Sequence, residues 1–345
     1  MEKIQKILDD HVYSNNIPGI SISVTNDENT LSLQSGNTSI QSKKPLSKDD
    51  CFQIGSLTKM FIATTILTLK DRGDLHLDQY AVDFLKDTPV PATITIRQLL
   101  QHRSGLEDYI IQEHNEKALV AWGLTDVKLP PEFLVQKAVD ATDNDQSDDC
   151  YAYSNTNYII LGMIIEKITG RSVSEVLDSL FTQPLGLKNT SLPQAPVSLS
   201  TNGHSRLTDD LSEETGELKE LSVYNPSVPW TAGAMTSTPE EINMWLHALM
   251  TGKLLKDSSL KEMIDFSFTS EETEKYGLGI TQFHVADEVC AIGHHGGIQG
   301  YESLALYFPE ENLYLTVLIN QMPSGIGDIV EELYNALVTK EQAQS

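Results

Sequence analysis

Alternating apolar and polar residues predict strands near both ends of the chain. Ile20 to Val24 alternates in this way, and Thr30 to Gln34 follows after a short polar turn as its hairpin partner. The same signals return late in the sequence, separated by turns. We predict a short strand over Cys51 to Ile54 and longer strands over Tyr276 to His284, Val289 to His294, Leu304 to Phe308 and Tyr314 to Asn320.

Helical spacing dominates the stretch between these two groups of strands. Strand signals fade from about residue 76 to residue 224, and Gly and Pro separate apolar runs of helical length. Amphipathic helices also open and close the chain. We predict helices over Met1 to Asp10, Met60 to Lys70, Ile96 to Gln101, Glu132 to Val139, Asn157 to Thr169, Ser174 to Phe181, Thr236 to Thr251 and Ile329 to Val338.

This order of elements predicts an α/β fold of the α+β type. The economical architecture is one antiparallel sheet built from both chain ends and flanked by the terminal helices, with an all-helical subdomain inserted. We place the sheet subdomain at residues 1–75 and 225–345 and the helical subdomain at residues 76–224. A site between the two subdomains would draw residues from both.

Charge and composition narrow the class of partner. The 345 residues carry 24 Lys and Arg against 49 Asp and Glu, a net charge of −25. Nucleic-acid binding needs basic patches, so we expect no nucleic-acid partner, and the small-molecule substrate that we expect is implied by the family resemblance below. We also expect no membrane span, because no segment has the required apolar length. Nothing in the sequence points to an oligomeric state.

The N-terminal stretch and the cysteines bear on the cellular compartment. The N-terminal stretch lacks an apolar h-region and a cleavage site, which predicts a cytoplasmic protein as the sequence stands. Removal of an export signal would instead place it in the periplasm or outside the cell. The scattered cysteines Cys51, Cys150 and Cys290 form no disulfide framework and favour a reducing compartment.

Ser56-Leu57-Thr58-Lys59 is the first segment that could carry chemistry. If Ser56 begins a helix, Lys59 lies about one turn further on the same face. A serine hydroxyl becomes a nucleophile when a base takes its proton, and a lysine with a lowered pKa can be that base. The spacing alone is weak, because Ser258-Ser259-Leu260-Lys261 repeats it. We interpret that second copy as a capping box of Ser259 and Glu262.

Tyr153-Ser154-Asn155 is the second segment, at the mouth of the predicted helix that starts near Asn157. A phenol beside a lysine can pass a proton to a leaving group, and a carboxamide can hold a substrate amide. Tyr13-Ser14-Asn15 repeats this motif at the end of the first helix, where plain helix termination explains it.

The third segment, Gly293 to Gly297, contains His294, His295 and Gly296 on a predicted strand. Glycines inside a strand indicate a close backbone approach, for which a bound substrate is one explanation and a bulge another. Adjacent strand histidines point to opposite faces and chelate a metal poorly, so we expect no metal site there. The acidic stretch Asp140 to Asp149 lacks the glycine and closing Glu of a calcium loop, and we interpret it as a solvated loop.

Taken together and in this order, the three segments resemble the Ser-x-x-Lys, Tyr-x-Asn and Lys/His-x-Gly motifs of the penicillin-recognising serine hydrolases. The branch that the chain resembles comprises class C β-lactamases, penicillin-binding D-alanyl-D-alanine carboxypeptidases and esterases. The resemblance extends over nearly the whole chain. It includes Ile17 to Val24, Phe52 to Lys59, Leu99 to Leu106, Tyr153 to Tyr158, Ala232 to Thr238, Tyr276 to Gly279 and Gly293 to Gly297.

The resemblance implies a role for each motif residue. Ser56 would be the nucleophile, Lys59 its general base and Tyr153 the group that carries the proton to the leaving group. Asn155, His294, His295 and Gly296 would bind the substrate. The backbone N–H groups of Ser56 and Gly297 would form the oxyanion hole, His102 would be a packing residue, and no cofactor is implied.

Departures from the family pattern bear on the substrate. Where β-lactamases and carboxypeptidases place Ser or Thr hydroxyls for a substrate carboxylate, this chain has His295 and Gly297. We therefore predict an esterase or a small amidase or D-peptidase working through an acyl-enzyme on Ser56. A D-alanyl-D-alanine carboxypeptidase or weak β-lactamase is the alternative within the family, and a catalytically silent binding or scaffold protein is the alternative outside enzymes. The loops over Asp108 to Lys128 and Ser198 to Pro229 would set the choice of substrate.

Overall fold

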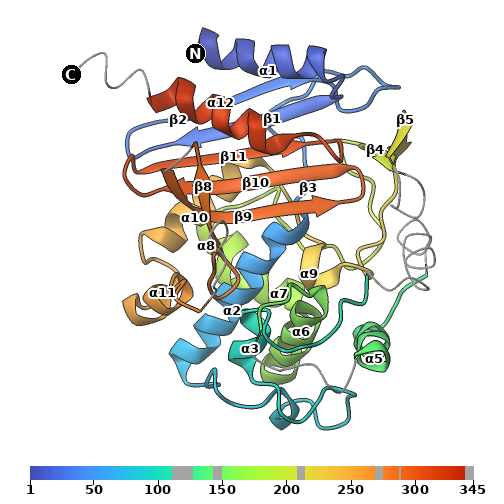
Figure 1. The fold of residues 1–345 in the computed structure, drawn as a ribbon, viewed down its shortest axis with the longest axis vertical. Coiled ribbons are helices and arrows are strands. Elements are labelled where there is room, and N and C mark those ends of the chain that lie inside the picture. Colours follow the sequence, from blue (N-terminus) through green and yellow to red (C-terminus); the bar gives the residue numbers. More distant parts are fainter. Residues whose placement is uncertain (111–126, 143–149, 208–213, 269–274, 287–288, 339–345) are drawn as a thin grey trace.

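A seven-stranded antiparallel sheet crosses one half of the molecule (Figure 1). The computed structural model describes residues 1–110, 127–142, 150–207, 214–268, 275–286 and 289–338. The strand order is β2-β1-β11-β10-β9-β8-β7, and each neighbouring pair is antiparallel. The strands are β1 (Gly19–Thr25), β2 (Thr30–Gly36), β7 (Lys275–Tyr276), β8 (Thr281–Val285), β9 (Val289–Ile298), β10 (Tyr301–Phe308) and β11 (Leu313–Ile319).

Both chain ends contribute to this sheet, as the sequence predicts. Ile22 of β1 pairs with Val317 of β11, so an N-terminal strand lies beside a C-terminal one within the sheet. Every residue of β11 is buried, because layers of helices cover the sheet on both faces. The predicted fold class is confirmed.

Two terminal helices, α1 (Glu2–Ser14) and α12 (Ile326–Val338), lie side by side on the outer face of the sheet (Figure 1). In α12 the buried positions Ile329, Val330 and Leu333 recur at helical spacing, which makes one apolar stripe. That stripe belongs to one hydrophobic cluster with Ile4 and Leu8 of α1 and the outer-face residues of the sheet.

The remaining helices lie on the other side of the sheet. They are α2 (Thr58–Arg72), α3 (Ile96–Leu100), α5 (Pro131–Ala141), α6 (Asn155–Thr169), α7 (Val173–Leu177), α8 (Gln183–Leu185), α9 (Trp230–Gly233), α10 (Pro239–Met250) and α11 (Asp257–Met263). The short 3-10 turns η1 (Gly55–Leu57) and η2 (Ala81–Asp83) and the π turn η3 (Asp178–Thr182) connect them.

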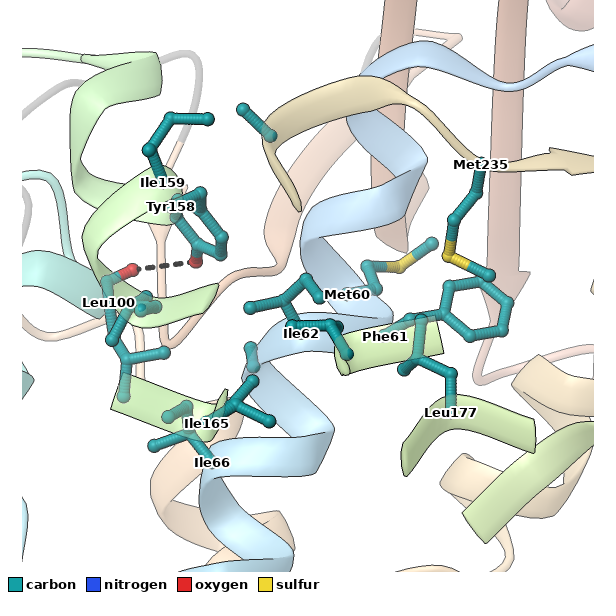
Figure 2. Close-up of a cluster of buried hydrophobic side chains, with 14 of the residues drawn as sticks. Met60, Phe61, Ile62, Ile66, Leu100, Tyr158, Ile159, Ile165, Leu177 and Met235 are labelled. Atoms are coloured by element: carbon teal, nitrogen blue, oxygen red, sulfur yellow. Dashed lines mark hydrogen bonds between the residues drawn. The ribbon is translucent and has the colours of Figure 1, made fainter. Parts of the chain in front are cut away.

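Helix α2 is the centre of the second core, and nearly all its residues to Leu69 are buried. Figure 2 shows its apolar residues beside Tyr158, Ile159 and Ile165 of α6. The Tyr158 hydroxyl donates to the carbonyl oxygen of Leu100 at 3.1 Å, so the buried phenol has a partner. Because α2 and α6 begin beside the two Ser- and Tyr-containing motifs, their packing holds those motifs together.

Two parts of the predicted layout differ in the structure. The stretch Tyr276 to His284 is two strands rather than one, since Gly279 adopts φ +75° and Gly277 N donates to Ile280 O within a tight turn. The predicted all-helical stretch 76–224 also contains the hairpin of β4 (Gly203–Leu207) and β5 (Glu214–Leu221). The polar sequence of these two strands, with Glu217, Lys219 and Glu220 in β5, gave no apolar strand signal. The short strands β3 (Phe52–Gln53) and β6 (Thr236–Ser237) pair separately.

Candidate active site

Gly55 sets the position of the serine. It adopts φ +49°, which favours glycine, and a Cβ there would lie 3.0 Å from the backbone oxygen of Gly297. The chain therefore turns from β3 into η1 in close contact with β9. Ser56 follows in this turn and Lys59 lies in the first turn of α2, so the Ser-x-x-Lys spacing places both on one face.

Ser56 Oγ accepts hydrogen bonds from two of the predicted site residues. Lys59 Nζ and Tyr153 Oη each lie 2.9 Å from it. Two proton-bearing groups thus meet one hydroxyl oxygen, although Tyr153 lies 97 positions further along the chain.

Lys59 is fully buried, and its ammonium group has an acceptor for each of its N–H bonds. Besides Ser56, Nζ donates to Asn155 Oδ1 and to the carbonyl oxygen of Ala232, both at 2.7 Å. Burial lowers the pKa of Lys59 from 10.5 to about 7, and the nearby Asp108 carboxylate opposes the shift. Loss of one proton would leave two N–H bonds for Asn155 and Ala232 and a lone pair for Ser56.

Tyr153 is fixed by packing on His102. The two rings lie 4.1 Å apart at an angle of 30°, and Lys59 Nζ lies 4.9 Å from the Tyr153 ring centre. Desolvation raises the pKa of the Tyr153 phenol well above 10, so it is protonated near neutral pH. His102 is buried, accepts a hydrogen bond from Ser154 N, and has a pKa lowered well below 6.5 by burial. His102 is therefore a packing residue, as the family resemblance implies.

Asp108 is a site residue that the motifs did not reveal. Its buried carboxylate accepts from Asn155 Nδ2 at 2.7 Å and from Asn155 N at 3.1 Å. Burial raises the pKa of Asp108, although the N–H donors oppose the rise. The sequence offered one signal near Asp108, since the segment Leu99 to Leu106, part of the family resemblance, ends two residues before it.

His294 faces this group from β9. Its Nε2 lies 3.0 Å from the Tyr276 hydroxyl, and its ring centre lies 6.5 Å from that of Tyr153. Burial, reinforced by the charge of Lys59, lowers the pKa of His294 to about 3. A neutral imidazole therefore faces the Ser56 group from β9.

His295 points to the opposite face of the strand, as the alternation requires. Its Nε2 lies 3.0 Å from Glu302 Oε1, and the side chain is 45% exposed. Gly296 is buried against the chain just before Ser56, where a Cβ would lie 2.4 Å from Ile54 O. Gly296 thus brings β9 close to the serine turn, whereas its predicted contact with substrate stays a prediction.

A pocket of about 610 Å³ opens over these residues. Ser56, Tyr153, His294, His295 and Gly297 all line it, together with Tyr151, Tyr276, Phe283, Asp328 and Glu331. Lys59 and Asn155 lie beneath this surface, in contact with each other. Of the predicted site residues, the structure thus gathers all but Gly296 around one pocket or directly under it.

Neither a metal site nor a membrane span is found among the described residues. Among those residues, no group of His, Cys, Asp and Glu side chains has the arrangement needed to hold a metal ion. Most of the acidic loop, residues 143–149, lies outside the described residues, as do positions 111–126 and 208–213 of the two predicted substrate loops. No helix in the described part of the chain is long and apolar enough to cross a membrane.

Ser56, Lys59 and Tyr153 form one hydrogen-bonded group, and the chain belongs to the β-lactamase family of serine hydrolases. The sequence model of that family, described as Beta-lactamase, matches residues 4–340. Penicillin-binding protein 4* of Bacillus subtilis is 25% identical over 301 residues, which is 83% of this chain and 64% of that protein. Protein flp of Staphylococcus aureus is 26% identical over 360 aligned residues, covering 99% of this chain and 67% of that protein. The chain thus spans about two thirds of these curated relatives.

Two solved structures match over nearly their full length. D-amino acid amidase from Ochrobactrum anthropi SV3, complexed with D-phenylalanine, has a TM-score of 0.86 and 28% identity. The comparison covers 98% of this chain and 99% of the amidase. D-stereospecific amidohydrolase from a Streptomyces species has a TM-score of 0.85 and 27% identity, covering 97% of both chains.

Proposed function

We propose that this chain hydrolyses small amides and esters, with D-amino acid amides as the favoured class, through an acyl-enzyme on Ser56. The observation that carries the proposal is the pair of 2.9 Å hydrogen bonds at Ser56 Oγ, one from the buried lysine Lys59 and one from the phenol of Tyr153. A base with a pKa near 7 is suited to take a serine proton at neutral pH.

The chemistry divides into acylation and deacylation. In acylation, neutral Lys59 takes the Ser56 proton while Oγ attacks the substrate carbonyl, and backbone N–H groups of Ser56 and Gly297 receive the oxyanion. Tyr153 then gives its proton to the departing amine or alcohol and regains one from Lys59. In deacylation a water attacks the ester on Ser56, its proton passes to the Lys59–Tyr153 pair, and Ser56 recovers its hydrogen.

The pocket lining argues against a substrate that needs a cation for its carboxylate. Of the described residues that line the pocket, none is Lys or Arg. A substrate carboxylate therefore has no matched charge among these residues. The aromatic rings of Tyr151, Tyr153 and Tyr276 offer apolar contact. The likeness to D-amino acid amidase supports the proposed substrate class.

Carboxypeptidase or β-lactamase activity is the second candidate, and the kinship with penicillin-binding protein 4* favours it. Both activities handle substrates with a carboxylate. His295 is the middle residue of the segment His294 to Gly296 in β9. Its side chain hydrogen-bonds Glu302 on the face of the strand opposite His294. This arrangement supplies no hydroxyl for that carboxylate, so we rank these activities below the amidase.

A substrate panel tests the proposal. Purified protein would be assayed with D- and L-phenylalanine amide, their p-nitroanilides, p-nitrophenyl acetate, D-alanyl-D-alanine and nitrocefin, each beside Ser56→Ala. We expect release of ammonia from the D-amide that is lost in Ser56→Ala. Turnover of nitrocefin or D-alanyl-D-alanine in preference to every amide and ester would overturn the assignment of substrate. Absence of any Ser56-dependent turnover or acyl-enzyme would favour the silent scaffold.

A further inference from the structure

Asn155 has both ends of its amide engaged inside the protein. Its Oδ1 accepts from Lys59 Nζ at 2.7 Å and its Nδ2 donates to Asp108 Oδ2 at 2.7 Å. A flipped amide would place the NH₂ group against the lysine N–H bonds and the oxygen against the carboxylate. Both contacts would be repulsive, so the Asp108 carboxylate determines the orientation of Asn155.

Asp108 is itself held rigidly. Its other oxygen, Oδ1, accepts from Ile110 N at 2.9 Å. The flanking backbone is bound to the first turn of α6, because Thr156 Oγ1 donates to Glu107 O at 2.7 Å and accepts from Tyr109 N at 3.1 Å. The carboxylate also accepts from the backbone of Asn155, the first residue of α6, whose N-cap Ser154 makes no side-chain cap. An anion at a helix N-terminus is stabilised there.

We propose that Asp108 is a positioning residue for catalysis, which acts through Asn155 to hold the amine of Lys59 against Ser56. This inference rests on the proposed function. It gives Asn155 a second role, in which its side chain orients Lys59 in addition to binding the substrate. With Asp108 in place, Asn155 Oδ1 and Ala232 O hold two lysine N–H bonds, and the third position of Nζ faces Ser56.

Loss of the Asp108 charge would shift the pKa of Lys59 in a definite direction. The Asp108 charge raises the pKa of Lys59 against the larger effect of burial, so its removal lowers that pKa further. The other groups that face Lys59 carry no charge near neutral pH. They are the phenols Tyr153 and Tyr158, whose rings it contacts, and the imidazoles His102 and His294, whose pKa values are depressed.

The test compares Asp108→Asn with the wild type in the rate of Ser56 labelling by a fluorophosphonate between pH 5 and 9. Asn keeps the shape of the side chain and removes its charge. We expect the plateau rate to fall about 10- to 100-fold, as misplacement of a catalytic group does. We also expect the acidic limb to move to lower pH. Ser104→Ala is the matched control, because Ser104 Oγ bonds Asn157 of the same helix turn at 2.5 Å without contacting Lys59.

A double-mutant cycle separates positioning from a purely structural role. If Asp108 acts through Asn155, the loss of plateau rate caused by Asp108→Asn disappears in an Asn155→Ala background. Additive losses, or a wild-type rate and pH profile for Asp108→Asn, would overturn the inference. If Asp108→Asn does not fold, Asn155→Ala alone decides, since a wild-type labelling rate in that variant would also overturn it. Unlabelled wild-type protein would instead count against the proposed function.

Discussion

The amine nitrogen of Lys59 lies 2.9 Å from the hydroxyl oxygen of Ser56, and no part of the lysine side chain is exposed to solvent. Burial makes this lysine a base near neutral pH, and the hydrogen bond directs its proton transfer to one hydroxyl. Three parts of the fold meet at this contact: η1 and the start of α2 carry the pair, Tyr153 and Asn155 lie where the chain enters α6, and β9 carries His294.

The first prediction concerns pH. The base must be neutral to accept a proton, and the pKa of Lys59 is about 7. The rate of fluorophosphonate labelling at Ser56 should therefore rise as pH increases from 5 through 7 and level off above about 8. A stopped time course of labelling across this range measures it. A rate that is constant from pH 5 to 9 would show that no such base operates.

Replacement of the lysine should abolish this activation. Lys59→Met keeps an apolar chain of similar length but removes the base, so we expect kcat to fall about 10²- to 10⁴-fold. Lys261→Met is the matched control, because Lys261 belongs to the second Ser-x-x-Lys copy and is exposed. Steady-state assays on the best substrate of the panel measure both. Equal activity in the two variants would contradict the assigned role.

The phenol of Tyr153 should matter more for amides than for activated esters. An amine must be protonated as it leaves, whereas p-nitrophenolate leaves unaided. Tyr153→Phe keeps the ring contact with His102 and loses the hydroxyl, so amide hydrolysis should fall about 10²- to 10⁴-fold and p-nitrophenyl ester hydrolysis by less. Tyr13→Phe, in the exposed second Tyr-x-Asn copy, should change neither. Equal losses on both substrates would argue against proton delivery to the leaving group.

Gly55 and Gly73 form a matched pair for the serine turn. Both have positive φ, +49° and +85°, so replacement of either by Ala should cost about 1 kcal/mol or more in the free energy of unfolding. A Cβ at Gly73 meets nothing within 4 Å, whereas at Gly55 it meets the Gly297 backbone at 3.0 Å. Urea unfolding should show a loss of stability in both variants. Fluorophosphonate labelling of Ser56 should show that only Gly55→Ala loses activity. Full activity in that variant would mean that the contact with β9 does not position Ser56.

His294 should make the fold sensitive to acid. Its pKa is about 3 in the folded protein and about 6.5 in the unfolded chain, so between these values the unfolded state binds the extra proton. Stability should therefore be retained above pH 6.5 and decline as pH falls, by about 1.4 kcal/mol per pH unit for this one group. In urea unfolding at pH 4 to 7, the free energy of unfolding of His294→Gln should depend less steeply on pH than that of the wild type. An unchanged slope would mean that His294 is already protonated in the folded protein.

The sheet and the central helices follow from local patterns. Period-two alternation predicts β1, and continuous apolar runs predict β11 and α2, because these elements bury one face or all of their surface. Tyr276 to His284 was predicted as one strand because a tight turn over Gly277 and Gly279 leaves the apolar pattern intact. The β4–β5 hairpin is too polar to show a pattern.

The site could be predicted only where residues lie close in sequence. The spacing of Ser56 and Lys59 on one helix face is local, whereas the meeting of Ser56 with Tyr153 required the family resemblance. Asp108 went unnoticed because a single carboxylate in a loop carries no pattern. The second Ser-x-x-Lys copy was explained wrongly as a capping box: Ser259 lies inside α11, buried, with its hydroxyl donating to Asp71.

Intact mass spectrometry after incubation with a fluorophosphonate tests whether Ser56 is an activated nucleophile. We expect one adduct on the wild-type protein at pH 8 and none on Ser56→Ala, although the other serines remain present. An unmodified wild-type protein that is folded by circular dichroism, or an adduct that persists in Ser56→Ala, would contradict the claim that Lys59 activates Ser56 as a nucleophile.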